Sequence, residues 1–153
     1  MPSVTGVIVK GYGVASGESG NDQRFPDGTI KLQIPHFREH GFDFDAYFAG
    51  DWVCGTLNVS ITPHTLRILK ADYFLRGIKW TDIFPPENFF LVGLTLRFDG
   101  KNYRGLLYEP DPATKPDHFQ PPMHIEVICN RVPGIKTGDK VELDFDQAKI
   151  EIK

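Results

Sequence analysis

The chain has 153 residues, of which 41% are hydrophobic and 24% are charged, and its formal net charge is −3. That length fits one domain spanning residues 1–153, and the composition excludes disorder as the general state of the chain. The weak negative charge provides no basic field for a polyanion, so we expect no nucleic acid partner.

The cysteine content and the lack of long apolar stretches bear on where the protein is located. Cys54 and Cys129 are the two cysteines, too few for a disulfide scaffold and without the close spacing of a zinc site. No stretch approaches the ~20 apolar residues of a membrane helix, and the first residues lack the features of a secretion signal. We therefore expect a cytoplasmic protein with no membrane partner.

Short runs of apolar residues at or near period two dominate the chain, and this alternation is typical of strands. The runs cover residues 4–10, 29–34, 56–62, 89–98, 102–108, 124–129, 140–145 and 149–152. Turn residues separate several of them, and Asp99-Gly100 between two apolar runs is a strong signal of an antiparallel hairpin. The sequence therefore predicts a largely antiparallel sheet.

Two segments are predicted to be helical, residues 36–49 and residues 63–68. The first carries a broad apolar face, made by Phe37, Phe42, Phe44, Tyr47 and Phe48. Gly41 interrupts this helix at a cost of ~1 kcal/mol relative to Ala. Eight short strands would expose too many edges in a flat sheet of this length. The favoured fold is therefore mainly β, a small closed or partly closed β-barrel with one or two short helices.

Two stretches between the predicted elements have the composition of functional loops. Residues 11–28 are rich in glycine, and residues 109–122 hold a large share of the chain's 12 prolines. Proline lacks the backbone N–H that regular pairing needs. We therefore expect the second stretch to cross the surface or to cover an opening as a lid.

The pentapeptide Gly55-Thr56-Leu57-Asn58-Val59 is the most informative candidate site. In a strand, Thr56 and Asn58 point to the same face, so their hydroxyl and carboxamide oxygens can bind one hard cation. Mg²⁺ usually takes one or two protein ligands and leaves its other positions to water and substrate phosphates. Neutral ligands therefore predict Mg²⁺ beside a nucleotide. The plain alternative is a strand that opens at Gly-Thr, with Asn58 near a turn.

A second candidate is the small-residue turn after the first predicted strand, formed by Gly11, Tyr12, Gly13, Val14, Ala15 and Ser16. Glycines permit positive φ and let successive backbone N–H groups converge on an anion, as in phosphate-binding nests. Lys10 adds a nearby positive charge. The spacing matches neither the P-loop nor the dinucleotide fingerprint, so a plain flexible turn is the alternative.

Glu126 is the candidate acid–base residue. It lies in the predicted strand 124–129, where it shares a face with His124 and alternates with apolar neighbours. Either the carboxylate faces solvent, or it lies at the mouth of the barrel and accepts a proton from a substrate hydroxyl. The five histidines include no HExxH pair, and no Gly-x-Ser-x-Gly elbow occurs. The sequence therefore gives no support for a zinc site or for a hydrolase active site.

In their order along the chain, these features resemble the archaeal CTP-dependent riboflavin kinases, a family of small cradle-loop (RIFT-like) β-barrels. The resemblance runs over most of the chain. It is carried by residues 11–16, 30–37 with Leu-x-Ile-Pro-His-Phe, 55–59, 125–128, and the closing Gly-Asp-Lys-Val-Glu-Leu of residues 138–143.

The resemblance implies roles for individual residues. Thr56 and Asn58 would hold Mg²⁺, Glu126 would contact the flavin, and Thr114 and His118 would be further flavin contacts. The nucleotide would be bound by the glycine turn of residues 11–16 and by a second turn made of Arg131, Val132, Pro133 and Gly134. The guanidinium of the arginine in this second turn suits phosphate.

We therefore expect a phosphotransferase that moves a phosphoryl group from a nucleoside triphosphate, CTP by resemblance, to the ribityl 5′-hydroxyl of riboflavin, giving FMN. Mg²⁺ is the expected cofactor, and Glu126 is the expected catalytic residue. One alternative is a non-catalytic module that binds a flavin, a nucleotide or a peptide on the same barrel. Another is a DNA-contacting regulator, which the net charge of −3 disfavours.

Overall fold

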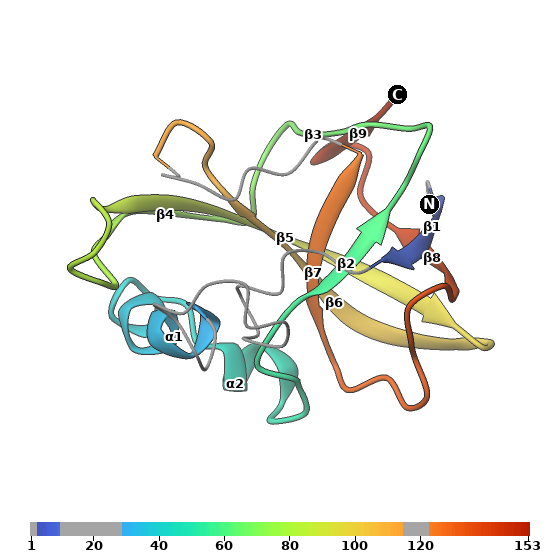
Figure 1. The fold of residues 1–153 in the computed structure, drawn as a ribbon, viewed down its shortest axis with the longest axis horizontal. Helices are drawn as coiled ribbons and strands as arrows, with labels where there is room; N and C mark the ends of the chain where they lie inside the picture. Colours follow the sequence, from blue (N-terminus) through green and yellow to red (C-terminus); the bar gives the residue numbers. More distant parts are fainter. Residues whose placement is uncertain (1–2, 10–28, 115–122) are drawn as a thin grey trace.

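Strands are the predominant secondary structure of the described residues, and Figure 1 shows how they and two helices are arranged. The structure is a computed structural model that describes residues 3–9, 29–114 and 123–153. In these residues the elements are β1 (Ser3–Val9), α1 (Thr29–Glu39), α2 (Phe44–Phe48), β2 (Leu57–Ser60), β3 (Leu66–Ile68), β4 (Tyr73–Ile78), β5 (Glu87–Phe98), β6 (Lys101–Pro110), β7 (His124–Cys129), β8 (Lys140–Asp144) and β9 (Ile150–Ile152).

Six strands close into an antiparallel barrel. β4, β5, β6, β7, β2, β1 and β8 are hydrogen-bonded neighbours in that order, and an additional pairing of β5 with β8 joins the ends of the last six. Every pairing around this ring is antiparallel. The prediction of a mainly β protein with a small closed barrel and short helices is confirmed.

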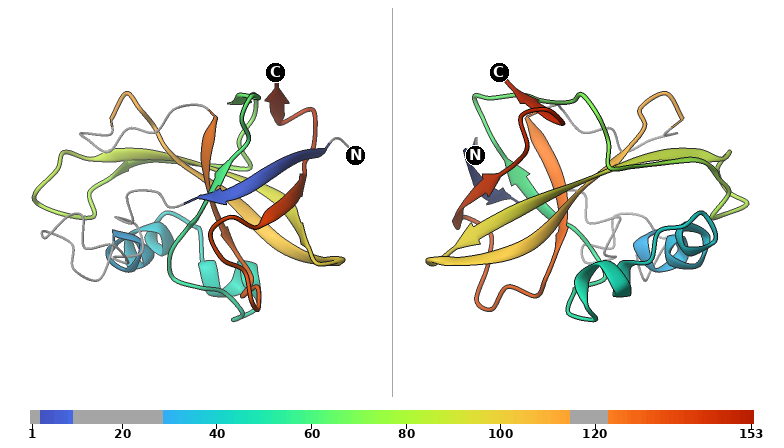
Figure 2. Two further views of the ribbon diagram at one scale, coloured as in Figure 1. Left: turned by 45° about the vertical axis from the view of Figure 1, so that its right-hand side comes forward. Right: turned by 180° about the vertical axis from the view of Figure 1, so that it is seen from behind.

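The length of β5 lets it belong both to the barrel and to an outlying sheet. Its first half pairs with β4, where Phe89 lies opposite Leu75, and its second half pairs with β8, where Leu96 lies opposite Leu143. β6 follows the other edge of β5 along its whole length. β4 therefore projects away from the barrel together with the first half of β5, as Figure 2 shows.

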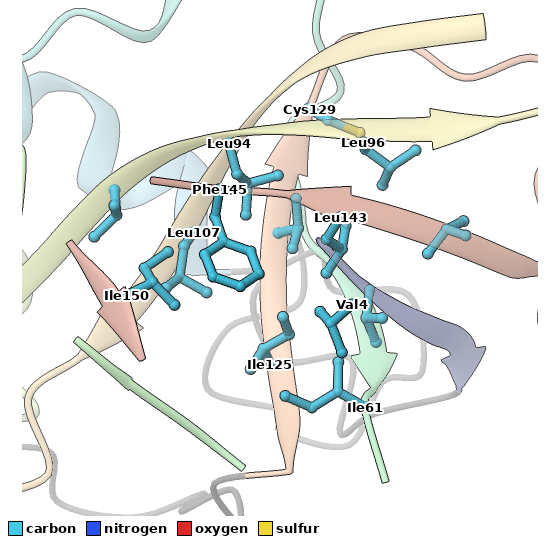
Figure 3. Close-up of a cluster of buried hydrophobic side chains, with 14 of the residues drawn as sticks. Val4, Ile61, Leu94, Leu96, Leu107, Ile125, Cys129, Leu143, Phe145 and Ile150 are labelled. Carbon is cyan, nitrogen blue, oxygen red and sulfur yellow. The ribbon is translucent and has the colours of Figure 1, made fainter. Parts of the chain in front are cut away.

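Alternate side chains of the barrel strands fill its interior. Leu94 of β5, Leu107 of β6, and Ile125 and Cys129 of β7 belong to one cluster of buried side chains (Figure 3). Successive side chains of a strand point to opposite faces, so the period-two pattern of the sequence selects these residues for the interior. The alternation that predicted the strands also predicted which of their faces is buried.

A second cluster of buried side chains lies on the other face of the same strands. Leu91 of β5, Tyr108 of β6 and Ile128 of β7 belong to it. Aromatic residues of the helices cover this face, and the ring centroid of Phe37 lies 4.8 Å from that of Phe89. The two helices and β4 thus form an extension with its own core on the outer side of the barrel (Figures 1 and 2).

Charged side chains line the outer face where β5 closes onto β8. Arg97 donates to Oε2 of Glu142 at 3.0 Å and also to Oδ2 of Asp144. Arg97 and Glu142 lie directly opposite each other in the register. Opposite charges on facing strands favour this register, and a slip by one residue would move every side chain to the wrong face.

The predicted hairpin at Asp99-Gly100 is confirmed. Asp99 has φ 52° and Gly100 has φ 75°, and the flanking Phe98 and Lys101 are paired. Positive φ at both central residues is the signature of a type I′ turn, whose twist matches that of the strands it joins. Asp and Gly tolerate this conformation, which explains why the dipeptide could be recognised from sequence.

Residues 29–34, predicted as a strand, instead begin helix α1. The prediction placed Ile30 and Leu32 on one face of a strand. In the structure Ile30 is fully buried and Leu32 is 44% exposed, while Gln33 and Phe37 are buried with Ile30. Spacings of three, four and seven residues are helical, and packing against the second cluster decides between the two periods.

Residues 36–49, predicted as one helix, hold the last residues of α1, a break and the whole of α2. α1 ends at Glu39, and α2 begins after Asp43, whose carboxylate accepts hydrogen bonds from two backbone N–H groups in the first turn of α2. This N-cap fixes the start of the second helix. Between the two, Gly41 has φ 95°, a conformation that ends a helix and that glycine adopts without strain.

The helix predicted over residues 63–68 is wrong, because this segment is a turn followed by strand β3. The N–H of His64 donates to the carbonyl of Ile61 at 2.8 Å, and Thr65 then exchanges two backbone hydrogen bonds of 3.0 Å with Lys153. β3 pairs with β9 in a separate two-stranded sheet. Its partner β9 begins at Ile150, far along the chain from β3, so local sequence does not reveal the pairing.

β4 has no counterpart among the predicted strands. Its buried residues, Leu75 and Ile78, are three positions apart, and the register with β5 shifts between them. Gly77 has φ 66° at this irregularity. A bulge of this kind removes the period-two signal on which strand prediction depends.

Neither helix in the described ranges has the length and apolar character needed to cross a membrane.

Candidate functional site

Three of the predicted site residues meet where β2 lies beside β7. The hydroxyl of Thr56 donates a 3.0 Å hydrogen bond to Oε1 of Glu126. Asn58 lies directly opposite Glu126 in the register of β2 with β7, and directly opposed side chains share a face. All three are half-buried. We call Thr56, Asn58 and Glu126 the polar triad.

The alternation of the two strands explains where the polar triad points. Val59 of β2 and Val127 of β7 are fully buried in the barrel core. Their strand neighbours Asn58 and Glu126 therefore point to the outer face of the barrel wall. The carboxylate lies on the side that carries the helical extension, and the hydrogen bond from Thr56 orients it.

Tyr108 extends this row onto β6, where it lies opposite Glu126. Its side chain is buried, and its hydroxyl donates to Oε1 of the buried Gln33 in α1 at 2.7 Å. Burial raises the pKa of Tyr108 well above its ordinary value of 10.0, and the nearby carboxylates of Glu126 and Glu87 raise it further. The hydroxyl therefore stays neutral and ties α1 to the strand beside the triad.

A cavity of about 260 Å³ opens beside Thr56, between the segment that precedes β2 and the end of β7. Most of its lining side chains are apolar: Val53, Leu57, Val127, Cys129, Val132 and Ile135. Thr56, Asn130 and Arg131 are the polar contributors. An apolar wall with a few polar groups is typical of a small-molecule site.

The second predicted nucleotide turn lies at this cavity. Arg131 and Val132 line it, with Arg131 exposed and Val132 buried. Pro133 and Gly134 form an exposed turn, in which Gly134 has φ 79°. The structure therefore brings the arginine of this turn and the hydroxyl of Thr56 to the same cavity.

Neither cysteine has the lowered pKa of an activated thiol. Burial, with a smaller contribution from the carboxylate of Asp51, raises the pKa of Cys129 from 9.0 to about 12. Partial burial also raises the pKa of Cys54, whose side chain is exposed. Both thiols are protonated at neutral pH, and the thiol form is a poor nucleophile and a poor metal ligand.

The chemistry of the triad suits a hard cation better than a soft one. No group of three or more His, Cys, Asp or Glu side chains gathers within the ranges that the structure describes. Thr56 and Asn58 offer neutral oxygens, and Glu126 adds one carboxylate beside them. Oxygen ligands in small number are what Mg²⁺ accepts from protein.

Thr114 lies in the turn that follows β6. Its hydroxyl accepts from the backbone N–H of Asn88 at 2.9 Å and donates to the carbonyl of Asp111 at 3.2 Å. These bonds join the turn to β5. The remaining predicted contacts, His118 and the glycine turn of residues 11–16, lie outside the described residues.

Sequence reasoning missed three residues next to the site: Gln33, Tyr108 and Asn130. Gln33 carries a signal in hindsight, since it is the one polar residue on a helical face with Ile30 and Phe37. Tyr108 and Asn130 carry none, because their partners come from distant parts of the chain.

No protein-family model matches this chain, and no curated protein does so either.

Proposed function

We propose that the protein is a phosphotransferase that moves a phosphoryl group from a nucleoside triphosphate, CTP by resemblance, to the ribityl 5′-hydroxyl of riboflavin, giving FMN. The observation that carries the proposal is the hydrogen bond between Thr56 and Glu126. It joins a predicted metal ligand to the residue predicted to accept the proton of the substrate hydroxyl. Phosphoryl transfer depends mainly on positioning and on neutralising charge. A polar triad beside a cavity suits that task.

Thr56 and Asn58 are assigned to Mg²⁺. Thr56 directs its hydroxyl hydrogen to Glu126, so its oxygen lone pairs point away from that bond and toward a cation. Asn58 adds a carboxamide oxygen from the same side of β2. Mg²⁺ bound there would neutralise charge on the triphosphate.

Glu126 is assigned to the acceptor hydroxyl. In the transfer, the hydroxyl oxygen forms a bond to the γ-phosphorus while the bond to the β,γ-bridging oxygen breaks, and the nucleoside diphosphate leaves. The hydroxyl proton passes to the carboxylate of Glu126. A half-buried carboxylate held by Thr56 is oriented for such a proton transfer.

The cavity and its rim are assigned to the donor nucleotide. The guanidinium of Arg131 is exposed at the cavity, and guanidinium groups bind phosphate oxygens through two parallel hydrogen bonds. The apolar wall suits a flat aromatic ring. Of the polar triad, Thr56 lines this cavity, so the proposal puts the triphosphate between the rim and Thr56.

The proposal is tested with purified protein, Mg²⁺, riboflavin and each of the four nucleoside triphosphates, with FMN measured by liquid chromatography. We expect FMN with CTP or another triphosphate, and none without Mg²⁺. Thr56→Val keeps the side-chain shape and removes the hydroxyl, and Glu126→Gln removes the charge. Each is expected to lower kcat/KM by roughly 100-fold or more.

Thr5→Val is the matched control for Thr56→Val. Thr5 is exposed on β1 and lies opposite Glu142 of β8, away from the triad, so this variant should keep wild-type activity. The absence of FMN with all four triphosphates would contradict the proposal. Unchanged kcat/KM in Thr56→Val and Glu126→Gln would contradict the assigned roles.

The mainly apolar wall of the cavity favours a second candidate, a module that binds a flavin or a nucleotide without turnover. Isothermal titration distinguishes the two. A kinase needs Mg²⁺ for tight nucleotide binding, because the ion offsets the charge of the phosphates. Flavin binding that is independent of Mg²⁺, with no FMN formed, would favour the binding module.

A further inference from the structure

The segment between α2 and β2, residues 51–56, forms one wall of the cavity and ends at Thr56. Trp52 anchors this 51–56 segment to the helical extension, because its ring stacks on that of Phe44 with centroids 4.9 Å apart. Its Nε1 also donates to Oδ1 of Asp45 at 2.6 Å. Contacts with α2 thus hold this wall of the cavity in place.

Asn130 holds the same segment from the strand side. It follows β7 directly, and its backbone N–H donates to the carbonyl of Arg104 in β6 at 3.0 Å. Its Oδ1 accepts from the backbone N–H of Arg104 at 2.8 Å, and its Nδ2 donates to the carbonyl of Asp51 at 2.8 Å. One carboxamide therefore joins β6 and the end of β7 to the 51–56 segment.

The strand end of this link is itself fixed by α2. The guanidinium carbon of Arg104 lies 4.1 Å from the ring centroid of Tyr47. The hydroxyl of Tyr47 donates to the carbonyl of Gly105 at 3.2 Å. Two contacts of α2 with β6 thus hold the backbone to which Asn130 is bonded. The carboxamide therefore connects this fixed part of β6 to the 51–56 segment, which is one wall of the cavity.

We propose that Asn130 is a positioning residue: by holding Asp51 it fixes the wall of the cavity that the proposed function assigns to the nucleotide. Asn130 lines the cavity between Cys129 and Arg131. The kinetic consequence of this inference rests on the proposed function. The position of the wall can be measured without any ligand.

The two cysteines of the chain can report the position of the 51–56 segment. Cys129 lines the cavity and is 6% exposed, whereas Cys54 lies in the 51–56 segment and is exposed. A thiol-alkylating reagent is expected to modify Cys54 faster than Cys129, because Cys54 is exposed and Cys129 is buried. Mass spectrometry of proteolytic peptides follows the two thiols separately. Displacement of the wall is expected to speed the modification of Cys129.

Asn130→Asp changes one arm of the link and keeps the other. The retained oxygen still accepts from Arg104, while the new carboxylate oxygen meets the carbonyl of Asp51 with no hydrogen to share. We expect alkylation of Cys129 to be roughly tenfold faster, the factor that corresponds to one lost hydrogen bond. For FMN formation we expect KM for the nucleotide to rise by roughly tenfold with a much smaller change in kcat.

Asn102→Asp is the matched control. It makes the same change at the far end of the β5–β6 hairpin, where Oδ1 of Asn102 accepts from Nε of Arg97 at 3.2 Å. Alkylation of Cys129 should keep its wild-type rate in this variant. Asn130→Ser removes both arms of the carboxamide and serves as a second variant should Asn130→Asp fail to fold.

An unchanged rate at Cys129 in the folded Asn130 variants would overturn the inference, as would an equal increase in Asn102→Asp. A fall in kcat with no change in KM would also overturn it, because that result indicates a general loss of the active fold. Wild-type protein that forms no FMN would contradict the proposed function alone, and the alkylation rates would still decide the role of Asn130.

Discussion

Two buried polar side chains, Gln33 and Glu87, interrupt the apolar cluster of the helical extension. Gln33 accepts from the hydroxyl of Tyr108 at 2.7 Å, and Glu87 accepts from Nε1 of Trp80 at 2.6 Å. Buried polar groups are costly without such partners, because they lose their bonds to water. The bond between Tyr108 and Gln33 therefore contributes to the position of α1 next to the polar triad.

Tyr108→Phe tests the first of these bonds. The change leaves Oε1 of the buried Gln33 without its donor, so the free energy of unfolding is expected to fall by about 1–3 kcal/mol. Chemical denaturation measures this difference. Tyr73→Phe is the control, since Tyr73 is 39% exposed, and its effect should stay within about 0.5 kcal/mol. Equal effects of the two changes would contradict the role assigned to Tyr108.

Helix α1 shows how packing overrides local sequence at the scale of the element. Pro35 lies inside α1, where proline removes a backbone hydrogen bond and disfavours the helical conformation of its neighbour. The ring of Phe37 nevertheless packs against Phe44 and Phe89, with centroids 5.5 Å and 4.8 Å away. These contacts exist only when the segment is helical, since they need its buried residues on one helical face.

A pair of alanine substitutions distinguishes helix from strand in this segment. Ile30→Ala is expected to lower the free energy of unfolding by about 2–5 kcal/mol, because Ile30 is fully buried. Leu32→Ala is expected to change it by less than about 0.5 kcal/mol, because Leu32 is 44% exposed. Urea denaturation compares them. A strand would place both side chains on one face and make the two losses similar.

At the scale of the whole molecule, β5 links two cores that face opposite sides of one sheet. Its second half closes the barrel on β8, and its first half carries β4 and the helices. Buried titratable groups occur in both cores, with Cys129 in the barrel and Tyr108 in the extension. Their burial makes the stability of the whole fold sensitive to high pH.

The direction of this sensitivity follows from the raised pKa values. The pKa of Cys129 rises from 9.0 to about 12, and that of Tyr108 rises well above 10.0, in both cases mainly through burial. As pH rises, these two groups lose their protons at a lower pH in the unfolded chain than in the folded protein. The stability that they contribute is therefore fully present below pH 9 and is lost as pH rises toward the folded pKa values, by up to about 1.4 kcal/mol per pH unit and group.

We therefore expect the free energy of unfolding to fall between pH 9 and pH 11, as measured by denaturation at fixed pH values. Cys129→Ala should make this fall less steep, because it removes one buried acid. Cys54→Ala is the control and should change the slope less, since Cys54 is exposed. The same slope in wild type and Cys129→Ala would show that the buried thiol does not contribute.

Sequence alone determined those parts of the protein whose signal is local. Alternating apolar residues located the barrel strands, and Asp99-Gly100 located a hairpin, because both patterns reflect the conformation of a few consecutive residues. The same period placed Thr56 and Asn58 on one side of a strand.

Tertiary structure decided everything that depends on a distant partner. It set the helical conformation of residues 29–34, the pairing of β3 with β9, and the meeting of Thr56 with Glu126. The link from Asn130 to Asp51 belongs to the same group. Each depends on contacts between segments far apart in the chain, and the free energy of such contacts outweighs local propensity without leaving a local pattern.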